Sequence, residues 1–188
     1  MKPAAFNYER PETVSAAIKL LQDTGGSAKI LAGGQSLGPM LNMRLINPTL
    51  LIDIARISEL NDISDDGDAL IFGACVTHAA IEDRMVPDAS GGMMPAVARG
   101  IAYRAVRNKG TIGGSLAHAD PAADWPTVLT ALDAKFTIQS AGGATRTVEP
   151  GDFFVGPLTT TLGEHEMLTS IEVPTLGCLL YTSDAADE

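Results

Sequence analysis

The spacing of hydrophobic residues divides the chain into two regions of different character. In the first, Val14, Ile18 and Leu21 recur at helical intervals. Residues 49–54 form an apolar run of strand length, which is typical of a strand covered on both faces. The pattern predicts a small N-terminal α/β lobe, from residue 1 to about residue 55. Its predicted elements are a helix over 10–23 with Pro11 in the first turn and Gly25-Gly26 at the end, a strand over 29–32, a helix over 36–44 and a strand over 49–54.

The second region favours short antiparallel strands with helices between them. Residues 63–74 are typical of a hairpin that turns at Asp66-Gly67, and residues 141–144 separate another pair of strands. The predicted fold class is therefore α+β, with the N-terminal lobe joined to a larger lobe of helices and a mainly antiparallel sheet, over about 56–177. The further predicted elements are helices over 77–85, 94–102 and 124–132, and strands over 135–140, 145–149 and 167–173.

Composition and charge narrow the class of function. The chain has 188 residues and a formal net charge of −10, which argues against a nucleic-acid surface. No apolar run approaches the length of a membrane span, so no transmembrane segment is expected. The N-terminal residues lack the apolar region of a signal peptide, and a cytoplasmic location is the expectation.

Metal chemistry within this chain is not indicated. Cys75 and Cys178 are too few for an iron–sulfur cluster held by four thiolates. His78, His118 and His165 show no ligand spacing, and polar or capping roles are expected for them.

Two glycine-rich segments carry the strongest functional signal. The first, Lys29–Leu37, reads strand, Gly-Gly-Gln-Ser, helix, but Gln35 breaks the dinucleotide fingerprint and Pro39 breaks the P-loop pattern. Glycines without Cβ atoms let backbone N–H groups approach a phosphate. Two interpretations stay open for this turn: anion binding, or a tight turn that needs glycine only for its backbone conformation.

The second segment, Gly110–Asp124, adds hydroxyl groups and nearby charge. Its glycine pair lies among threonine and serine, and Arg104, Arg107 and Lys109 precede it. These cations either contact an anion or form salt bridges. Asp120 and Asp124 either cap a helix or accept hydrogen bonds from a ligand. Two such turns together suggest a pyrophosphate cradled from both sides.

No catalytic constellation of side chains accompanies these turns. The sequence contains no Ser-His-Asp ordering and no close acid pair that would support a nucleophilic or acid–base mechanism. The absence indicates that a bound cofactor supplies the chemistry.

Four stretches resemble the FAD-binding, medium-sized subunit of molybdenum hydroxylases, the group with the carbon monoxide dehydrogenase medium subunit and the xanthine dehydrogenase flavin domain. They are KILAGGQSL, NPTLLIDI, VRNKGTIGGSLAHADPAAD and EMLTSIEVP, beginning at Lys29, Asn47, Val106 and Glu166. The opening Pro-x-x-Phe-x-Tyr-x-x-Pro is similar too. The resemblance runs from residue 3 to about 174 and implies the two-lobed FAD-binding domain of the PCMH type, with FAD extended between the lobes.

The resemblance also implies which residues contact FAD. One side of the pyrophosphate would be lined by residues 30–37 and the other by residues 111–115. An acidic residue, Asp124, would touch the cofactor, and two apolar residues would pack near it. In full, the implied FAD-binding residues are Ile30, Leu31, Ala32, Gly33, Gly34, Gln35, Ser36, Leu37, Ile101, Thr111, Ile112, Gly113, Gly114, Ser115, Asp124 and Leu168.

By the same resemblance, the chain would be an electron-transfer subunit of an oxidoreductase. FAD would take electrons from an iron–sulfur small subunit, which draws them from a molybdenum-cofactor large subunit, and would pass them to an external acceptor. Two alternatives remain: a stand-alone FAD-dependent oxidoreductase of the same fold, and a non-catalytic binding or assembly module. Flavin retention separates the module from the other two, and co-purification with partner subunits separates the first from the second.

The last residues follow a different pattern. Residues 178–188 resemble translated sequencing-adapter sequence, and we expect them to be a non-native tail. The FAD-binding domain is therefore expected over residues 1–177. Relatives in the family continue for roughly another hundred residues as a C-terminal domain, which is expected to be missing here.

Overall fold

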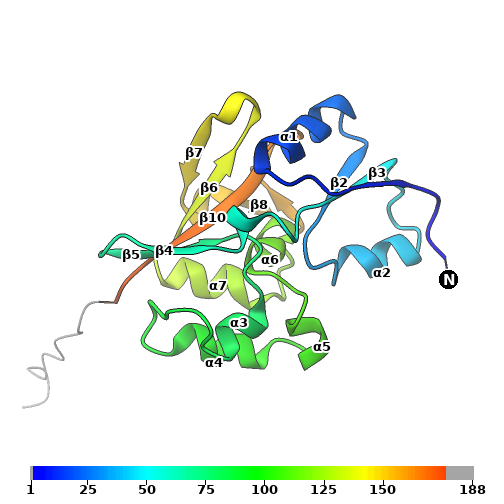
Figure 1. Ribbon diagram of the computed structural model, residues 1–188. Helices are drawn as coiled ribbons and strands as arrows, with labels where there is room; N and C mark the ends of the chain where they lie inside the picture. The colour runs from blue at the N-terminus through cyan, green and yellow to red at the C-terminus, as the bar shows by residue number, and fades with distance from the viewer. Residues whose placement is uncertain (1, 177–188) are drawn as a thin grey trace, which may run out of the picture.

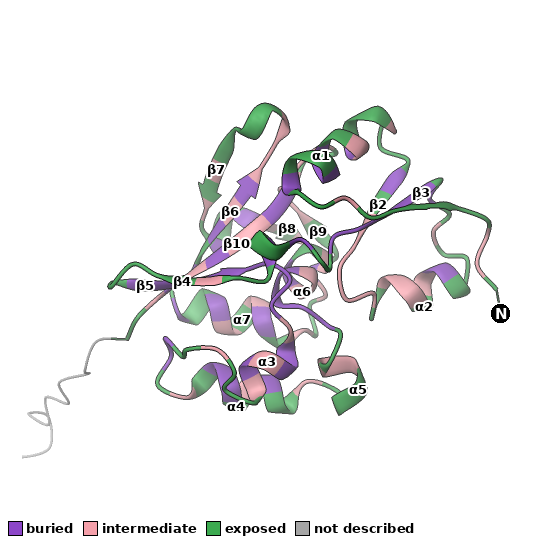
Figure 2. Cartoon of the chain, viewed as in Figure 1, coloured by how far each residue is buried: buried purple, intermediate pink, exposed green. Residues whose placement is uncertain are grey.

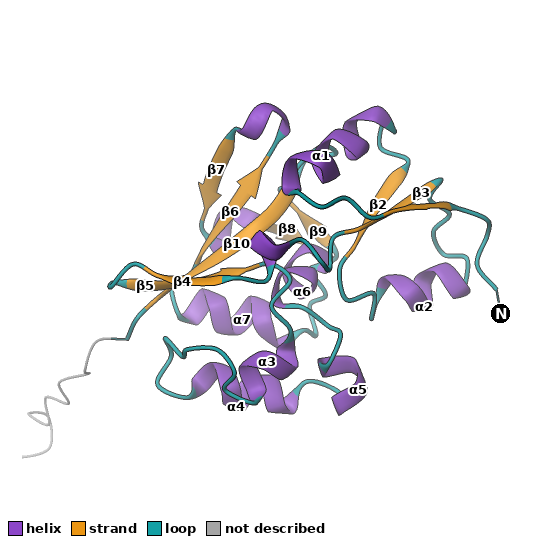
Figure 3. Cartoon of the chain, viewed as in Figure 1, coloured by secondary structure: helices purple, strands orange, loops and turns teal. Residues whose placement is uncertain are grey.

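The computed structural model describes residues 2–176, in which two main sheets and a short two-stranded ribbon are connected by helices (Figures 1 and 3). The smaller sheet is parallel, with the order β1-β3-β2. Its central strand is buried at every position, which confirms the prediction of a strand covered on both faces. The three strands are β1 (Asn7–Glu9), β2 (Ala28–Leu31) and β3 (Leu50–Asp53).

Helix α1 (Val14–Asp23) begins later than its sequence pattern suggested. The hydroxyl of Thr13 accepts a hydrogen bond from the backbone N–H of Ala16 at 3.2 Å, so Thr13 is the N-cap. The prediction that Pro11 lies in the first turn is therefore wrong, because the chain at Pro11 is still outside the helix. Helix α2 (Leu37–Asn42) follows the first glycine turn, as expected.

The larger sheet is antiparallel, in the order β4-β5-β10-β6-β7. Both predicted hairpins are present, and Gly67 adopts a φ of 94° in the first of them. The five strands are β4 (Ile63–Asp65), β5 (Ala69–Gly73), β6 (Lys135–Gln139), β7 (Thr145–Val148) and β10 (Met167–Pro174). The ribbon pairs β8 (Phe154–Gly156) with β9 (Thr159–Thr160), after the short helix α8 (Pro150–Phe153).

Five helices gather on one side of the larger sheet (Figure 1). A core lies between these helices and the sheet, in which Trp125, Leu116 and Met94 pack with Phe72 and Phe136 of the strands. Figure 2 shows buried positions on both the helices and the strands. Burial of aromatic and aliphatic surface on this scale is the main driving force for folding. The helices are α3 (His78–Glu82), α4 (Met93–Gly100), α5 (Arg104–Arg107), α6 (Ile112–His118) and α7 (Asp124–Ala131). Among the described residues, no helix has the length and apolar character needed to cross a bilayer.

The second glycine segment was expected as a turn, and this expectation is corrected by α6. Thr111 caps the helix by accepting a hydrogen bond from the N–H of Gly114 at 3.1 Å. The glycine pair thus lies in the first turn of a helix. Two adjacent glycines obscure a helical pattern, because glycine has low helix propensity and contributes no hydrophobic periodicity.

The two glycine segments touch each other. A Cβ atom added to Gly33 would lie 2.0 Å from the carbonyl oxygen of Lys109 and 2.8 Å from the Cα of Gly110. No side chain fits in this space, so only glycine permits the backbone of the loop after β2 to approach the segment before α6. Close approach between these two backbones joins the N-terminal lobe to the larger lobe.

We predict that Gly33→Ala destabilises the protein by about 1–3 kcal/mol, because the new methyl group must push the two backbones apart. Gly38→Ala is the matched control, since nothing lies within 4 Å of a Cβ added there. That change should be neutral or stabilising, by up to about 1 kcal/mol, because Gly38 lies inside α2. Urea unfolding of both variants measures the difference, and equal stabilities would contradict the contact.

Candidate functional site

A cleft of about 690 Å³ lies between the two lobes, within the usual range for small-molecule sites. Both glycine segments contribute to its walls, together with β10 and the loop before it. The cleft is lined by most of the residues that the sequence nominated: Ile30, Ala32, Gly33, Gly34, Gln35, Ser36, Leu37, Ile101, Thr111, Gly113, Gly114, Ser115 and Leu168.

Three of the nominated residues lie elsewhere. Leu31 packs beneath the first turn, where its Cδ1 would lie 3.0 Å from a Cβ added to Gly34. Ile112 is completely buried in the larger core. Asp124 is exposed at the start of α7 and makes no side-chain capping bond, whereas Asp120 does line the cleft. A contact of Asp124 with a ligand stays a prediction.

The first glycine turn presents free backbone donors to the cleft. Within the described part of the chain, the N–H groups of residues 33–37 have no protein acceptor. Gly34 has a φ of 68°, a conformation that glycine adopts without strain. The side-chain amide of Gln35 donates to the carbonyl of Gly33 at 2.8 Å and thereby braces the turn. Consecutive unpaired N–H groups of this kind form a concave site for an anion.

The second glycine segment differs, because its N–H groups are already bonded inside the protein. Ile112 donates to the carbonyl of Val76 and Gly113 donates to that of Ala74, both at 2.9 Å. Gly114 and Ser115 donate to the side chain and the backbone carbonyl of Thr111. These four N–H groups are therefore already paired, and contact of residues 111–115 with a pyrophosphate stays a prediction.

Close packing explains the glycines of the second segment. A Cβ on Gly113 would lie 2.7 Å from the carbonyl oxygen of Ala74, and a Cβ on Gly110 would lie 2.8 Å from the ring of His78. Gly114 is different: apart from the capping hydroxyl of Thr111 at 2.7 Å, its nearest neighbour is Ala32 at 3.9 Å, across the cleft. Gly114 thus keeps the cleft open at its narrow part.

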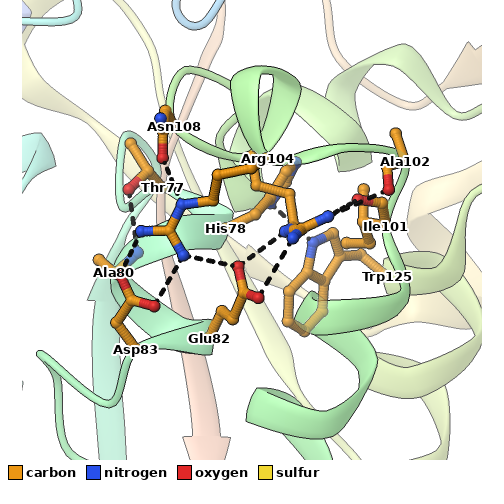
Figure 4. Close-up of polar contacts among 11 residues, drawn as sticks. Thr77, His78, Ala80, Glu82, Asp83, Ile101, Ala102, Arg104, Asn108 and Trp125 are labelled. Atoms are coloured by element: carbon orange, nitrogen blue, oxygen red, sulfur yellow. Dashed lines mark hydrogen bonds and ion pairs between the residues drawn. The ribbon is translucent and has the colours of Figure 1, made fainter.

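Two of the three basic residues before the second segment, Arg104 and Arg107, form ion pairs within the protein (Figure 4). Arg107 donates from Nε to Glu82 Oε2 at 2.7 Å and from Nη2 to Oε1 at 3.2 Å. Arg104 pairs with Asp83 and also reaches Glu82 at 3.1 Å. The hydrogen bond from Arg107 holds the pKa of the Glu82 carboxyl below its ordinary value. Of the two interpretations of these arginines, the structure supports salt bridges.

A second ion pair fixes the loop between β9 and β10. Arg146 donates to both carboxylate oxygens of Glu166, at 2.9 and 2.7 Å, and to the carbonyl of Thr161 at 2.9 Å. Glu166 in turn accepts from the N–H of Gly163 at 2.8 Å. Because this loop forms one rim of the cleft, the pair holds that rim in place.

His78 lies beneath the cleft in a buried polar contact that the sequence did not reveal. Its Nδ1 accepts a hydrogen bond from Nε1–H of Trp125 at 3.0 Å, which places the ring proton of the neutral form on Nε2 (Figure 4). Burial, assisted by the charge of Arg107, lowers the pKa of His78 to about 4. Neutral His78 is thus a fixed element of the cleft floor. A tertiary contact across 47 positions leaves no mark in local sequence spacing.

The cleft has the chemistry of a binding site. Within residues 2–176 no group of His, Cys, Asp and Glu is placed to hold a metal ion. Burial raises the pKa of the Cys75 thiol to about 12, so it is protonated and unreactive. The cleft offers backbone donors, the hydroxyls of Ser36 and Ser115, the side chain of Lys29, the carboxyl of Asp120 and apolar walls. Groups of this kind suit the binding and orientation of a ligand.

We predict that His78 makes the stability depend on pH. Its pKa is lower in the folded protein, so between about pH 6.5 and pH 4 the unfolded state binds more protons and acid favours unfolding. From pH 7 to pH 5, this residue should remove about 2 kcal/mol from the free energy of unfolding. His78→Gln keeps an acceptor for Trp125 but does not titrate, and urea unfolding should show a correspondingly smaller loss. Equal losses in the two proteins would contradict the assignment.

Comparison with known proteins identifies the family. The sequence model of the family described as "FAD binding domain in molybdopterin dehydrogenase" matches residues 4–176 of this chain. The nicotine 6-hydroxylase medium subunit of Paenarthrobacter nicotinovorans is 42% identical over 174 residues, which are 93% of this chain and 61% of the relative. The carbon monoxide dehydrogenase medium chain of Hydrogenophaga pseudoflava is 39% identical, over 93% of this chain and 60% of the relative.

Solved structures agree in fold. Quinoline 2-oxidoreductase from Pseudomonas putida 86 superposes with a TM-score of 0.88 at 41% identity, covering 93% of this chain and 61% of that chain. Carbon monoxide dehydrogenase from Hydrogenophaga pseudoflava superposes with a TM-score of 0.91 at 39% identity, covering 95% and 62%. The chain thus spans about three fifths of the length of these relatives. It belongs to the family of FAD-binding domains of molybdopterin dehydrogenases, as its motifs indicated, and FAD is its cofactor.

Proposed function

We propose that the cleft between the lobes holds FAD and that the chain is the flavin-bearing part of a molybdenum hydroxylase. The observation that carries the placement is the row of unpaired N–H groups at residues 33–37, facing a cleft of about 690 Å³. A pyrophosphate needs such donors, because each N–H group stabilises an oxyanion without itself carrying a full charge. Bound FAD would supply the redox chemistry, accepting electrons and passing them on.

The residues of the chain would bind and orient the cofactor from two sides. On the N-terminal side, residues 30–37 would contact the pyrophosphate, with the N–H groups of 33–37 as donors. On the opposite side, Thr111, Gly113, Gly114 and Ser115 would form a close-fitting wall, to which Ser115 adds a hydroxyl. Ile101 and Leu168 would contribute apolar contacts. Asp120 adds a carboxyl on the cleft, which suits an acceptor for a ribose hydroxyl.

The family relatives support the wider role. The matched proteins include the medium subunit of a hydroxylase and the medium chains of carbon monoxide dehydrogenases, which implies further subunits. We propose that this protein likewise assembles with an iron–sulfur small subunit and a molybdenum-cofactor large subunit. In that complex the flavin would take electrons from the iron–sulfur clusters and deliver them to an external acceptor.

We predict that the full chain retains FAD after incubation and desalting, seen by visible absorption, and that Gly114→Val lowers the affinity by roughly 10- to 100-fold. A branched side chain at Gly114 would project into the narrow part of the cleft. Gly151→Val is the matched control: Gly151 lies in α8 away from the cleft, with nothing within 4 Å of an added Cβ.

Isothermal titration measures the FAD affinity of the wild type, Gly114→Val and Gly151→Val. The control should bind as the wild type does. No binding by folded wild type would overturn the placement of FAD in this chain, and equal affinity of wild type and Gly114→Val would move the cofactor away from Gly114.

We predict that the tagged chain, purified from its native host, carries two partner subunits with it. Metal analysis of the purified complex should find iron and molybdenum. Among the described residues the chain itself offers no metal-binding group, so both metals would come from partners. Purification of a flavin-loaded chain without either metal would favour the stand-alone oxidoreductase instead.

A further inference from the structure

The corner between α4 and α5 is held in an unfavourable backbone conformation at the edge of the cleft. Ile101 follows α4 as its C-cap and lines the cleft, and Ala102 comes next with a φ of 41°. This left-handed conformation disfavours residues that carry a Cβ atom. A strained conformation persists only where surrounding contacts fix it.

Arg107 supplies those contacts. Its Nη1 donates to the carbonyl oxygen of Ile101 at 2.9 Å and to that of Ala102 at 3.0 Å. The same guanidinium also donates hydrogen bonds to both carboxylate oxygens of Glu82. The planar guanidinium carries five N–H donors in a fixed fork, so it bonds both oxygens of one carboxylate and still has donors for two carbonyls.

Burial makes this arrangement rigid. The side chains of Arg107 and Glu82 are only 12% and 11% exposed, so water competes little for the hydrogen bonds between these two residues. Glu82 is the last residue of α3, whose first residue is His78, fixed to Trp125 in the core. A chain of contacts therefore runs from the core through Glu82 and Arg107 to Ile101.

We propose that Arg107 is a positioning residue for the cofactor: it holds the Ile101 corner so that the Ile101 side chain packs against bound FAD. The inference rests on the proposed function and deepens it, because it assigns the buried arginine a role in binding although it does not line the cleft. Arg107 acts through Ile101, and Glu82 keeps its guanidinium in place.

Arg104 is a natural comparison within the same cluster. It pairs with Asp83 and Glu82, but its side chain is 48% exposed, and its remaining side-chain bond goes to Asn108. It makes no bond to the carbonyls of the corner. Replacing Arg104 by lysine should therefore perturb the ion-pair cluster, whereas the hydrogen bonds that hold Ile101 stay in place.

The test is FAD affinity of the full chain with Arg107→Lys and Arg104→Lys, by isothermal titration. Lysine keeps the positive charge beside Glu82, which protects folding, but one ammonium cannot replace the fork. We expect Arg107→Lys to weaken FAD binding about tenfold, since charged hydrogen bonds that fix the corner are lost. Arg104→Lys should change it by about twofold or less, as is usual for exposed ion pairs.

A double-mutant cycle with Ile101→Ala separates positioning from a general structural effect. If Arg107 acts through Ile101, Arg107→Lys should have little further effect on FAD affinity once Ile101 is alanine. Additive effects of the two changes would overturn the inference. The absorption band of bound flavin should also shift in Arg107→Lys and not in Arg104→Lys, because only the former moves an apolar side chain at the cofactor.

Amide hydrogen exchange of the FAD-free chain tests the corner without the cofactor. Exchange at Ile101 and Ala102 should accelerate in Arg107→Lys and stay unchanged in Arg104→Lys. Wild type that binds FAD no better than a buffer blank would overturn the proposed function and this inference with it. Wild type and Arg107→Lys that bind equally well would overturn this inference alone.

Discussion

The approach of Gly33 to the backbone of Lys109 and Gly110 is the constraint on which the site depends. It brings the loop after β2 against the segment before α6, with no room for a Cβ atom between them. Two consequences follow. The lobes are held at a fixed separation, so the cleft has a defined width. The loop also turns the N–H groups of residues 33–37 away from protein acceptors. One backbone contact thus sets both the shape of the cleft and its donors.

The two glycine segments look equivalent in sequence yet perform different tasks. The first segment leaves its N–H groups free. The second segment donates its N–H groups to Val76, Ala74 and Thr111, and these hydrogen bonds anchor α6 to the segment that follows β5. Gly113 is needed for that anchoring, because its Cα lies against the backbone of Ala74. A cofactor pyrophosphate in this cleft would accept its backbone hydrogen bonds mainly from the first segment. The second would serve as a rigid wall.

The sequence predicted the parts of the fold that are encoded locally. Apolar spacing and turn residues placed β3, both hairpins and α7 within a residue or two, and most of the residues that the motif resemblance named do line the cleft. Prediction from the sequence failed where the local pattern is weak, or where a structural feature depends on residues far apart along the chain. Glycines concealed α6, the three-residue strand β1 is too short for a periodic pattern, and the contacts of His78 with Trp125 and Arg107 with Glu82 join distant positions. Likewise, spacing alone could not show that Ile112 is completely buried in the larger core.

A site suited to a diphosphate in a chain of net charge −10 is explained by the source of its donors, which are mainly backbone N–H groups. The arginines nearest the second segment are neutralised by Glu82 and Asp83, so they are not available to a ligand. Apart from Lys29, which lines the cleft, stabilisation of an anion would then rest on backbone N–H dipoles, whose positions the fold fixes before any ligand arrives. Such donors need no ordering of long side chains on binding, which is the entropic cost that Lys and Arg incur. The arginines instead hold backbone carbonyls and carboxylates, and their charge maintains the geometry of the cleft.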